Sequence, residues 1–192
     1  MFHPPLHLAD SFFGSKQYQN YDAIVASYHD QNSIFEFNSN CDIDNWQIIN
    51  DVVMGGRSTA SLFVDENQNG VFEGYISTEN NGGFSSIQLN TGKIEIGSFK
   101  NIELNIKGDG GTYQIRLKNS NKVAHSYTYN FKTNGNWEKI LIPLVEMEPS
   151  FRGYSLNLPN FNHSTIERIG ILKSSKINSK FKFLIKSFKL IN

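Results

Sequence analysis

Short runs of alternating apolar and polar residues recur along this chain from residue 33 onward, with Gly- and Asn-rich turns between them. In the run 101–107, for example, Ile102, Leu104 and Ile106 alternate with polar residues. A period of two predicts a β-strand with one buried face and one wetter face. On this basis we predict eleven strands, at 34–37, 46–49, 60–64, 71–77, 84–89, 101–107, 112–118, 126–132, 137–143, 166–172 and 181–190.

Eleven short strands without a helical pattern predict an all-β fold, an antiparallel β-sandwich or barrel. The chain has 192 residues, which suits one well-buried domain, and its 15 Phe and 8 Tyr can fill a core between two sheets. Residues 1–32 show no clear alternation. We therefore expect an N-terminal extension over 1–32 and a β-sandwich domain over 33–192.

The charge balance and the N-terminal sequence indicate in which cellular compartment the protein is expected. The 18 basic and 18 acidic residues balance, so the chain has no global electrostatic reason to bind nucleic acid or an anionic membrane. No apolar run has the length of a membrane span. The N-terminus lacks the basic residues of a secretory signal, and a single cysteine, Cys41, excludes an internal disulfide framework. These features predict a cytoplasmic protein.

Lysines are concentrated near the C-terminus, with no acidic residue among them. We interpret them as solvating an edge strand, in preference to forming a binding patch. They are Lys173, Lys176, Lys180, Lys182, Lys186 and Lys189.

Two segments join polar residues to a glycine pair: 46–58 reads WQIINDVVMGGRS and 79–86 reads ENNGGFSS. Glycine permits close backbone approach, and Asp or Asn beside it can bind backbone N–H groups. One interpretation is that the two loops meet and present Asp51, Arg57, Asn80 and Asn81 to a partner or ligand. The other is that Asp51 and Asn81 hold their own loops by side-chain to backbone hydrogen bonds. Both can hold at once.

A second candidate surface centres on Arg116. With Gln114, Glu103 and Asn105 it is expected to form a polar row on adjacent strands. Such a row can line a concave sheet face that binds sugars, or it can be a solvated face. A guanidinium fork at Arg116 suits carboxylate or phosphate.

The chain shows no residue set typical of catalysis, and we predict no catalytic residue, metal ligand or cofactor. Residues 65–70 match the first half of a calcium loop, but Ile76 stands where the bidentate Glu is required, which favours a plain hairpin turn. His125 and His163 have no acidic or cysteine companion at ligand spacing.

From about residue 33 to 190 the chain resembles the family of mitochondrial complex I intermediate-associated protein 30. The resemblance rests on the two glycine-pair segments, on Phe72-Glu73-Gly74, on the segment 107–117 (KGDGGTYQIRL), on Trp137 with Pro143, and on the segment 149–153 (PSFRG). It implies a jelly-roll sandwich similar to galactose-binding domains. It also implies an assembly chaperone that acts on intermediates of respiratory complex I. The absence of a transit peptide and of a fused nucleotide-binding module indicates a bacterial, stand-alone member.

Together these observations predict a non-catalytic binding domain whose partner is a protein, such as an intermediate of a respiratory or other membrane complex. The alternative is a carbohydrate-binding module that uses the concave sheet face. The predicted binding residues are Asp51, Gly55, Gly56, Arg57, Asn80, Asn81, Gly82, Gly83, Phe84 and Arg116.

Overall fold

A computed structural model describes residues 32–192 of the chain. The chain separates into two units, Met1–Ser33 and Ile34–Asn192, and nearly all of the described residues belong to the second. Apart from Asn32, the extension predicted over 1–32 lies outside the described residues. No helix in the described part is both long and apolar enough to cross a membrane.

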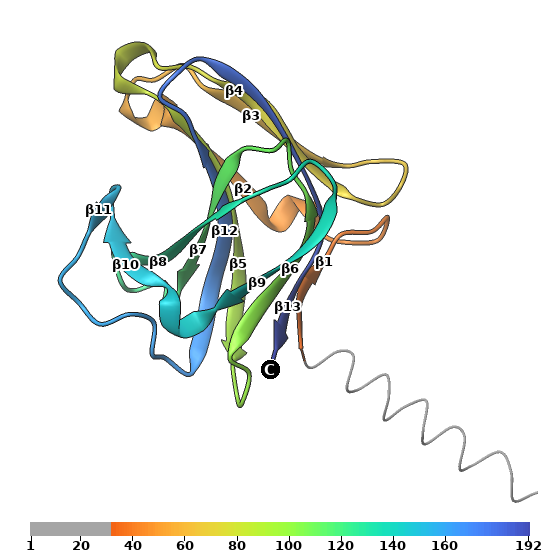
Figure 1. The fold of residues 1–192 in the computed structure, drawn as a ribbon, viewed down its shortest axis with the longest axis vertical. Coiled ribbons are helices and arrows are strands. Elements are labelled where there is room, and N and C mark those ends of the chain that lie inside the picture. Colours follow the sequence, from red (N-terminus) through yellow and green to blue (C-terminus); the bar gives the residue numbers. More distant parts are fainter. Residues whose placement is uncertain (1–31) are drawn as a thin grey trace, which may run out of the picture. The chain divides into compact units, whose positions relative to one another are not determined.

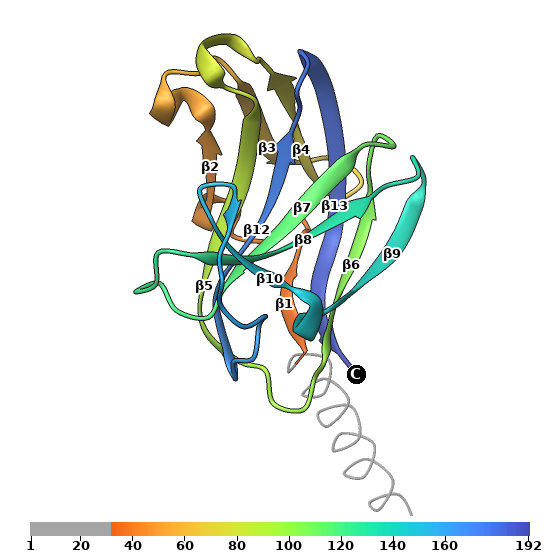
Figure 2. The same ribbon diagram turned by 60° about the vertical axis from the view of Figure 1, so that its left-hand side comes forward.

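The second unit is built from two antiparallel sheets (Figures 1 and 2). The first sheet has the order β3-β4-β13-β6-β9, with β1 also paired to β13. Its strands are β1 (Ser33–Glu36), β3 (Thr59–Val64), β4 (Gly70–Ile76), β6 (Asn101–Lys107), β9 (Trp137–Pro143) and β13 (Ser179–Ile191).

The second sheet has seven strands in the order β11-β10-β8-β7-β12-β5-β2. They are β2 (Trp46–Asn50), β5 (Phe84–Glu95), β7 (Thr112–Lys118), β8 (Ser126–Lys132), β10 (Glu148–Phe151), β11 (Tyr154–Ser155) and β12 (Thr165–Ser174). Short 3-10 turns join several strands: η1 (Ile43–Asn45), η2 (Asp51–Met54), η3 (Glu79–Asn81) and η4 (Leu144–Glu146). All eleven predicted strands are present, and the all-β sandwich is confirmed; β10 and β11 were not predicted.

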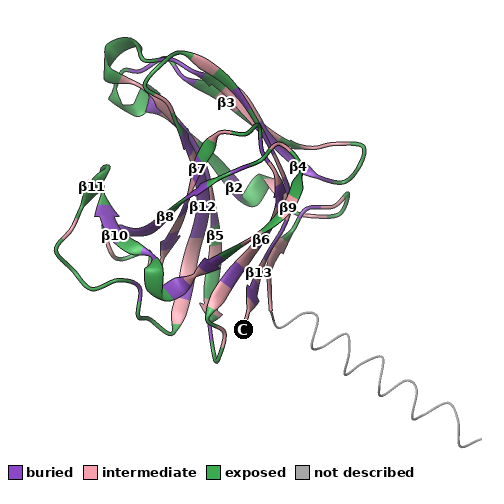
Figure 3. Ribbon diagram, in the orientation of Figure 1, coloured by how far each residue is buried: buried purple, intermediate pink, exposed green. Residues whose placement is uncertain are grey.

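The core lies between the two sheets, as the alternation predicts. Ile102, Leu104 and Ile106 of β6 are fully buried, while the residues between them are partly exposed (Figure 3). Aromatic contacts join the layers: the Trp46 ring of β2 lies 5.7 Å from the Phe188 ring of β13, and Tyr113 of β7 lies 4.4 Å from Phe183. Such pairs contribute more than their buried area alone.

The lysine-rich C-terminal strand is not an edge strand, so our interpretation of its lysines was wrong. β13 lies between β4 and β6, and both of its edges are paired. Lys173 belongs instead to β12 and is buried, with its Nζ 4.5 Å from the centroid of the Tyr113 ring. Pairing with strands distant in sequence placed β13 inside the sheet, which its own residues do not reveal.

The predicted polar row around Arg116 is also wrong. Glu103 and Asn105 lie on β6 in the first sheet, whereas Gln114 and Arg116 lie on β7 in the second. Consecutive strands of a sandwich commonly cross from one sheet to the other, so neighbours in sequence need not share a face.

The two glycine-pair loops lie together at one end of the sandwich (top of Figure 1). β2 pairs β5 with Asn50 opposite Ser85, so the turn that follows β2 lies next to the turn that precedes β5. The loop between β12 and β13 closes on the same end, where the Ser175 N–H donates to the Gly83 carbonyl at 2.9 Å. We call this set of loops, residues 51–58, 78–84 and 175–178, the loop end.

Candidate functional site

Asp51 is the residue on which the loop end is built. Its side chain is fully buried and accepts hydrogen bonds from the N–H groups of Ser58 (2.9 Å), Gly83 (2.6 Å) and Phe84 (3.2 Å). The hydroxyl of Ser58 donates a further bond to the same carboxylate. One carboxylate therefore ties both glycine-pair loops together, and no atom of Asp51 is exposed to contact a partner.

One glycine of each pair, Gly56 and Gly82, is required because this carboxylate lies against it. A Cβ at Gly56 would overlap the Asp51 carboxyl group, and a Cβ at Gly82 would lie 2.6 Å from its Oδ2. No ordinary side-chain contact is that short. Gly56 and Gly82 thus leave room for one buried acid. The other member of each pair, Gly55 or Gly83, has a positive φ, +90° or +133°, which glycine adopts without strain.

Hydrogen bonding sets the charge state of Asp51. Burial alone would raise the pKa of this carboxyl, but the bonds from Ser58, Gly83 and Phe84 together outweigh burial and lower the pKa below its usual value. The carboxylate is therefore ionised at neutral pH, the state in which it can accept all of these bonds.

The remaining predicted residues of the two loops form the outer part of the loop end. The Asn80 side chain donates to the Gly55 carbonyl at 3.0 Å, and Arg57 forms an exposed ion pair with Glu79 at 2.9 Å. Asn81 is exposed, and its side chain takes part in none of the hydrogen bonds of the described residues. Asn80, not Asn81, is thus the amide that holds the loops together.

Three consecutive apolar side chains project from the turn that Asp51 anchors. Val52, Val53 and Met54 are 59%, 74% and 62% exposed. Ile177, in the third loop of the same end, is 72% exposed. We call these four residues the apolar tip. Sequence reasoning did not single them out, although three apolar residues directly before a glycine pair are a visible signal.

Arg116 lies in a cleft on the outer face of the seven-stranded sheet, with a volume of about 270 Å³. The side chains that carry its polarity come from β5, β7, β8 and β12 and from the turn between β10 and β11. They are Ser86, Gln88, Arg116, Lys118, Ser126, Arg152 and Arg168. Phe84 also lines the cleft, and its N–H binds Asp51, so this residue joins the cleft to the loop end. Lys118, Arg152 and Arg168 were not predicted.

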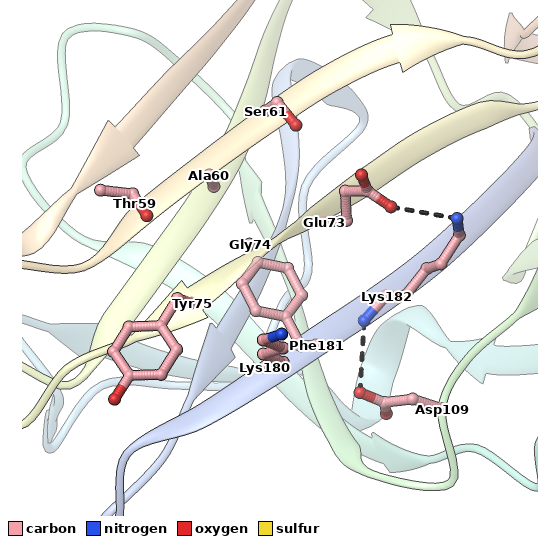
Figure 4. Close-up of a pocket in the computed structure, with 10 residues that line it drawn as sticks. All are labelled: Thr59, Ala60, Ser61, Glu73, Gly74, Tyr75, Asp109, Lys180, Phe181 and Lys182. Atoms are coloured by element: carbon pink, nitrogen blue, oxygen red, sulfur yellow. Dashed lines mark hydrogen bonds and ion pairs between the residues drawn. The ribbon is translucent and has the colours of Figure 1, made fainter.

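A wider hollow of about 760 Å³ lies on the six-stranded sheet (Figure 4). Its charged groups already contact one another: Lys182 Nζ lies 3.0 Å from the Glu73 carboxylate, and the Lys182 N–H donates to Asp109. With two acids and two lysines in its lining, this hollow has no excess charge with which to select a ligand.

Within residues 32–192, no group of three or more His, Cys, Asp or Glu side chains is placed to hold a metal ion. Asp65 accepts hydrogen bonds from the backbone and side chain of Asn69, which makes the calcium-like segment the hairpin turn between β3 and β4 that we predicted. His163 binds the Tyr127 hydroxyl at 2.7 Å within a small aromatic cluster.

The fold is that of carbohydrate-binding modules. A family 11 module from Clostridium thermocellum, solved with a mixed-linked tetrasaccharide, superimposes with a TM-score of 0.58 at 15% identity, covering 82% of this chain and 95% of the module. A second structure of a family 11 module, from a cellulosomal cellulase of the same organism, gives 0.60 at 16% identity, with 82% and 94% covered. An agarase gives 0.54 at 11% identity over 83% of this chain and 24% of its own. At these identities the likeness establishes the jelly-roll sandwich and nothing further.

The family follows from the sequence. Residues 35–185 match the family described as complex I intermediate-associated protein 30 (CIA30). The match spans most of the chain, so the chain belongs to the CIA30 family, and the resemblance noted from the glycine-pair segments is confirmed.

Proposed function

We propose that this chain is a non-catalytic interaction module of the assembly-factor kind, which binds a protein partner in the cytoplasm through its loop end. The family name supports a partner among the intermediates of respiratory complex I or of another membrane complex. The observation that carries the proposal is the apolar tip, because a rigid turn that exposes three consecutive apolar side chains is a feature of protein-binding surfaces.

The geometry of the loop end favours recognition of a protein. The Asp51 carboxylate fixes the base of the turn through its hydrogen bonds to Ser58 and Gly83. Little backbone entropy is therefore lost when a partner buries the tip. The exposed pair of Arg57 and Glu79 lies beside the tip and supplies a polar rim. Of the predicted binding residues, Arg57, Asn80 and Asn81 remain in this proposal, whereas Asp51 and the glycines act by shaping the turn.

The test is a crosslinked pull-down of the full chain from soluble and membrane fractions of its host, read by mass spectrometry. The variant Val53→Ser, Met54→Ser removes apolar surface without touching the core. Its matched control is Val145→Ser, since Val145 is 69% exposed on another 3-10 turn, at the opposite end of the sandwich (Figure 1). The proposal predicts a partner that the tip variant loses and the control keeps. Equal recovery with both variants would exclude the loop end as the binding surface.

A second candidate function is carbohydrate binding on the outer face of the seven-stranded sheet. The cleft beside Arg116 and the aromatic side chains of Phe84 and Phe151 in its lining favour it. A screen of neutral glycans at millimolar concentration tests this candidate. Binding that Phe151→Ala abolishes would support it, and the absence of any neutral ligand would dismiss it.

A further inference from the structure

The cleft on the seven-stranded sheet collects positive charge that nothing in the described structure neutralises. Four cationic side chains line it, Arg116, Lys118, Arg152 and Arg168, and no acidic residue does. Of the ion pairs within residues 32–192, none involves any of the four. The chain as a whole has zero net charge, so the net charge does not explain why four cationic side chains gather in one cleft.

Two of these cations oppose each other directly across the sheet. In the antiparallel pairing of β12 with β7, Arg168 stands opposite Lys118, and Gly170 stands opposite Arg116. Like charges in directly opposite positions destabilise a sheet. The pKa of Lys118 is lowered, first by burial and then by the charges of Arg168 and Arg116. The fold keeps this arrangement at a cost in stability.

The arginines are also short of hydrogen-bond partners. The Nε atoms of Arg116 and Arg168 are both buried and have no partner among the described residues. In the part of the chain that the structure describes, the Arg168 side chain makes a single hydrogen bond, from Nη1 to the Gln88 side chain, and it is long at 3.5 Å. Buried polar groups are nearly always satisfied, so two unpartnered guanidinium Nε atoms in one cleft indicate a missing acceptor.

The backbone brings Arg168 into this position. The register between β12 and β5 shifts here: Ile166 pairs with Ile94 but Arg168 pairs with Asn90, so β5 carries the extra residues of the irregularity. A bulge re-aims the side chains beside it and is common next to functional sites. Two residues further along β12, Gly170 pairs with Gln88 on one side and with Arg116 on the other, so all three face the cleft. Because Gly170 has no side chain, the bottom of the cleft between Gln88 and Arg116 stays open.

We propose that this cleft binds a small molecule through a phosphate or carboxylate group, with Arg116 and Arg168 as the two guanidinium donors and Lys118 and Arg152 at its sides. Paired guanidinium groups match the geometry of both anions and supply the charge-assisted bonds that their Nε atoms lack. The volume of about 270 Å³ is small for a ligand site, which favours a single anionic group over a polymer. This inference does not depend on the protein-binding role of the loop end.

The experiment is a titration of the full chain, followed by amide NMR shifts and calorimetry at low ionic strength, with inorganic phosphate, citrate and neutral glucose as separate probes. We expect phosphate or citrate to bind and glucose not to bind. Phosphate alone identifies a phosphate ligand, and citrate alone identifies a carboxylate ligand. The shifted amides should belong to β5, β7 and β12. Failure of both anions to bind, or equal binding of glucose, overturns the proposal.

Two variants distinguish specific binding of the anion in the cleft from non-specific attraction to positive charge. The double variant Arg116→Gln, Arg168→Gln should lower the affinity for the anion about tenfold or more, because it removes both guanidinium forks. The control Lys176→Gln, Lys180→Gln removes the same charge from exposed positions outside the cleft and should leave affinity nearly unchanged. An equal loss in both would contradict the proposal. As a check on folding, Arg168→Gln alone should keep or raise the thermal midpoint without anion, since it relieves the repulsion with Lys118.

Discussion

Single residues decide the stability of the loop end, and Asp51 decides most of it. Its buried carboxylate accepts bonds from two loops that are far apart in the sequence. The sequence pointed to Asp51 because it stands near a glycine pair. It did not show that the second pair, at Gly82 and Gly83, surrounds the same carboxylate, since that contact exists only after β2 pairs with β5.

Removing that carboxylate should be costly. We expect Asp51→Ala to lower the free energy of unfolding by about 2–4 kcal/mol, because several buried donors lose an ionised acceptor at once. Urea denaturation measures the change. Asp44→Ala, at an exposed position on η1, is the matched control and should change stability by less than about 0.5 kcal/mol. Similar values for the two variants would contradict the assigned role of Asp51.

A second residue-scale prediction concerns acid stability. Burial, and then the nearby His125, lower the pKa of His163. The unfolded chain therefore takes up a proton at higher pH than the folded chain does, and stability that is complete above about pH 6.5 is lost as pH falls below it. His163→Gln keeps a polar partner for the Tyr127 hydroxyl but does not titrate. Denaturation midpoints between pH 7 and pH 5 should fall less for this variant, and parallel curves would refute the prediction.

At the scale of elements, the alternation along the regular strands, such as β6 and β7, was enough to identify their buried faces. It was not enough to identify their neighbours. β6 and β7 follow each other in the chain and lie in different sheets, and β13 was expected at an edge yet lies between two strands. The irregular pairing of β12 with β5 next to Arg168 depends on both strands, so the sequence did not indicate that this side chain joins Arg116.

The turns at the loop end give the element-scale prediction. Gly82→Ala should destabilise the protein by about 1–3 kcal/mol, because the new methyl group overlaps the Asp51 carboxylate and must displace a loop. Gly55→Asn is the control: no atom lies within 4 Å of a Cβ there, and Asn tolerates the left-handed backbone of this residue, whose φ is +90°. The midpoints of thermal unfolding compare the two variants. A larger drop in the midpoint for Gly55→Asn than for Gly82→Ala would contradict the prediction.

At the scale of the whole sandwich, one continuous core joins both sheets. Trp46 of β2 packs on Phe188 of β13, and this contact between the layers reports on the whole core. A domain with one core is expected to unfold in a single transition.

Phe188→Ala should therefore cost about 3–5 kcal/mol and weaken both sheets together. Tryptophan fluorescence changes mainly through Trp46, which is buried, since Trp137 is already 45% exposed in the folded protein, and far-UV circular dichroism follows the strands. The two transitions should coincide in the wild type and shift to lower denaturant together in the variant. Separate transitions would show that the sheets unfold independently.

The sequence alone determined the local features: eleven strands, the all-β class, the two glycine-pair loops and the CIA30 family. Each depends on periodicity or on residues close together in the chain. The tertiary structure alone decided that one acid serves two loops, that Val52, Val53 and Met54 are exposed, and that Arg116 and Arg168 share a cleft. These depend on the register between strands distant in sequence, which hydrogen bonding and core packing set for the whole fold at once.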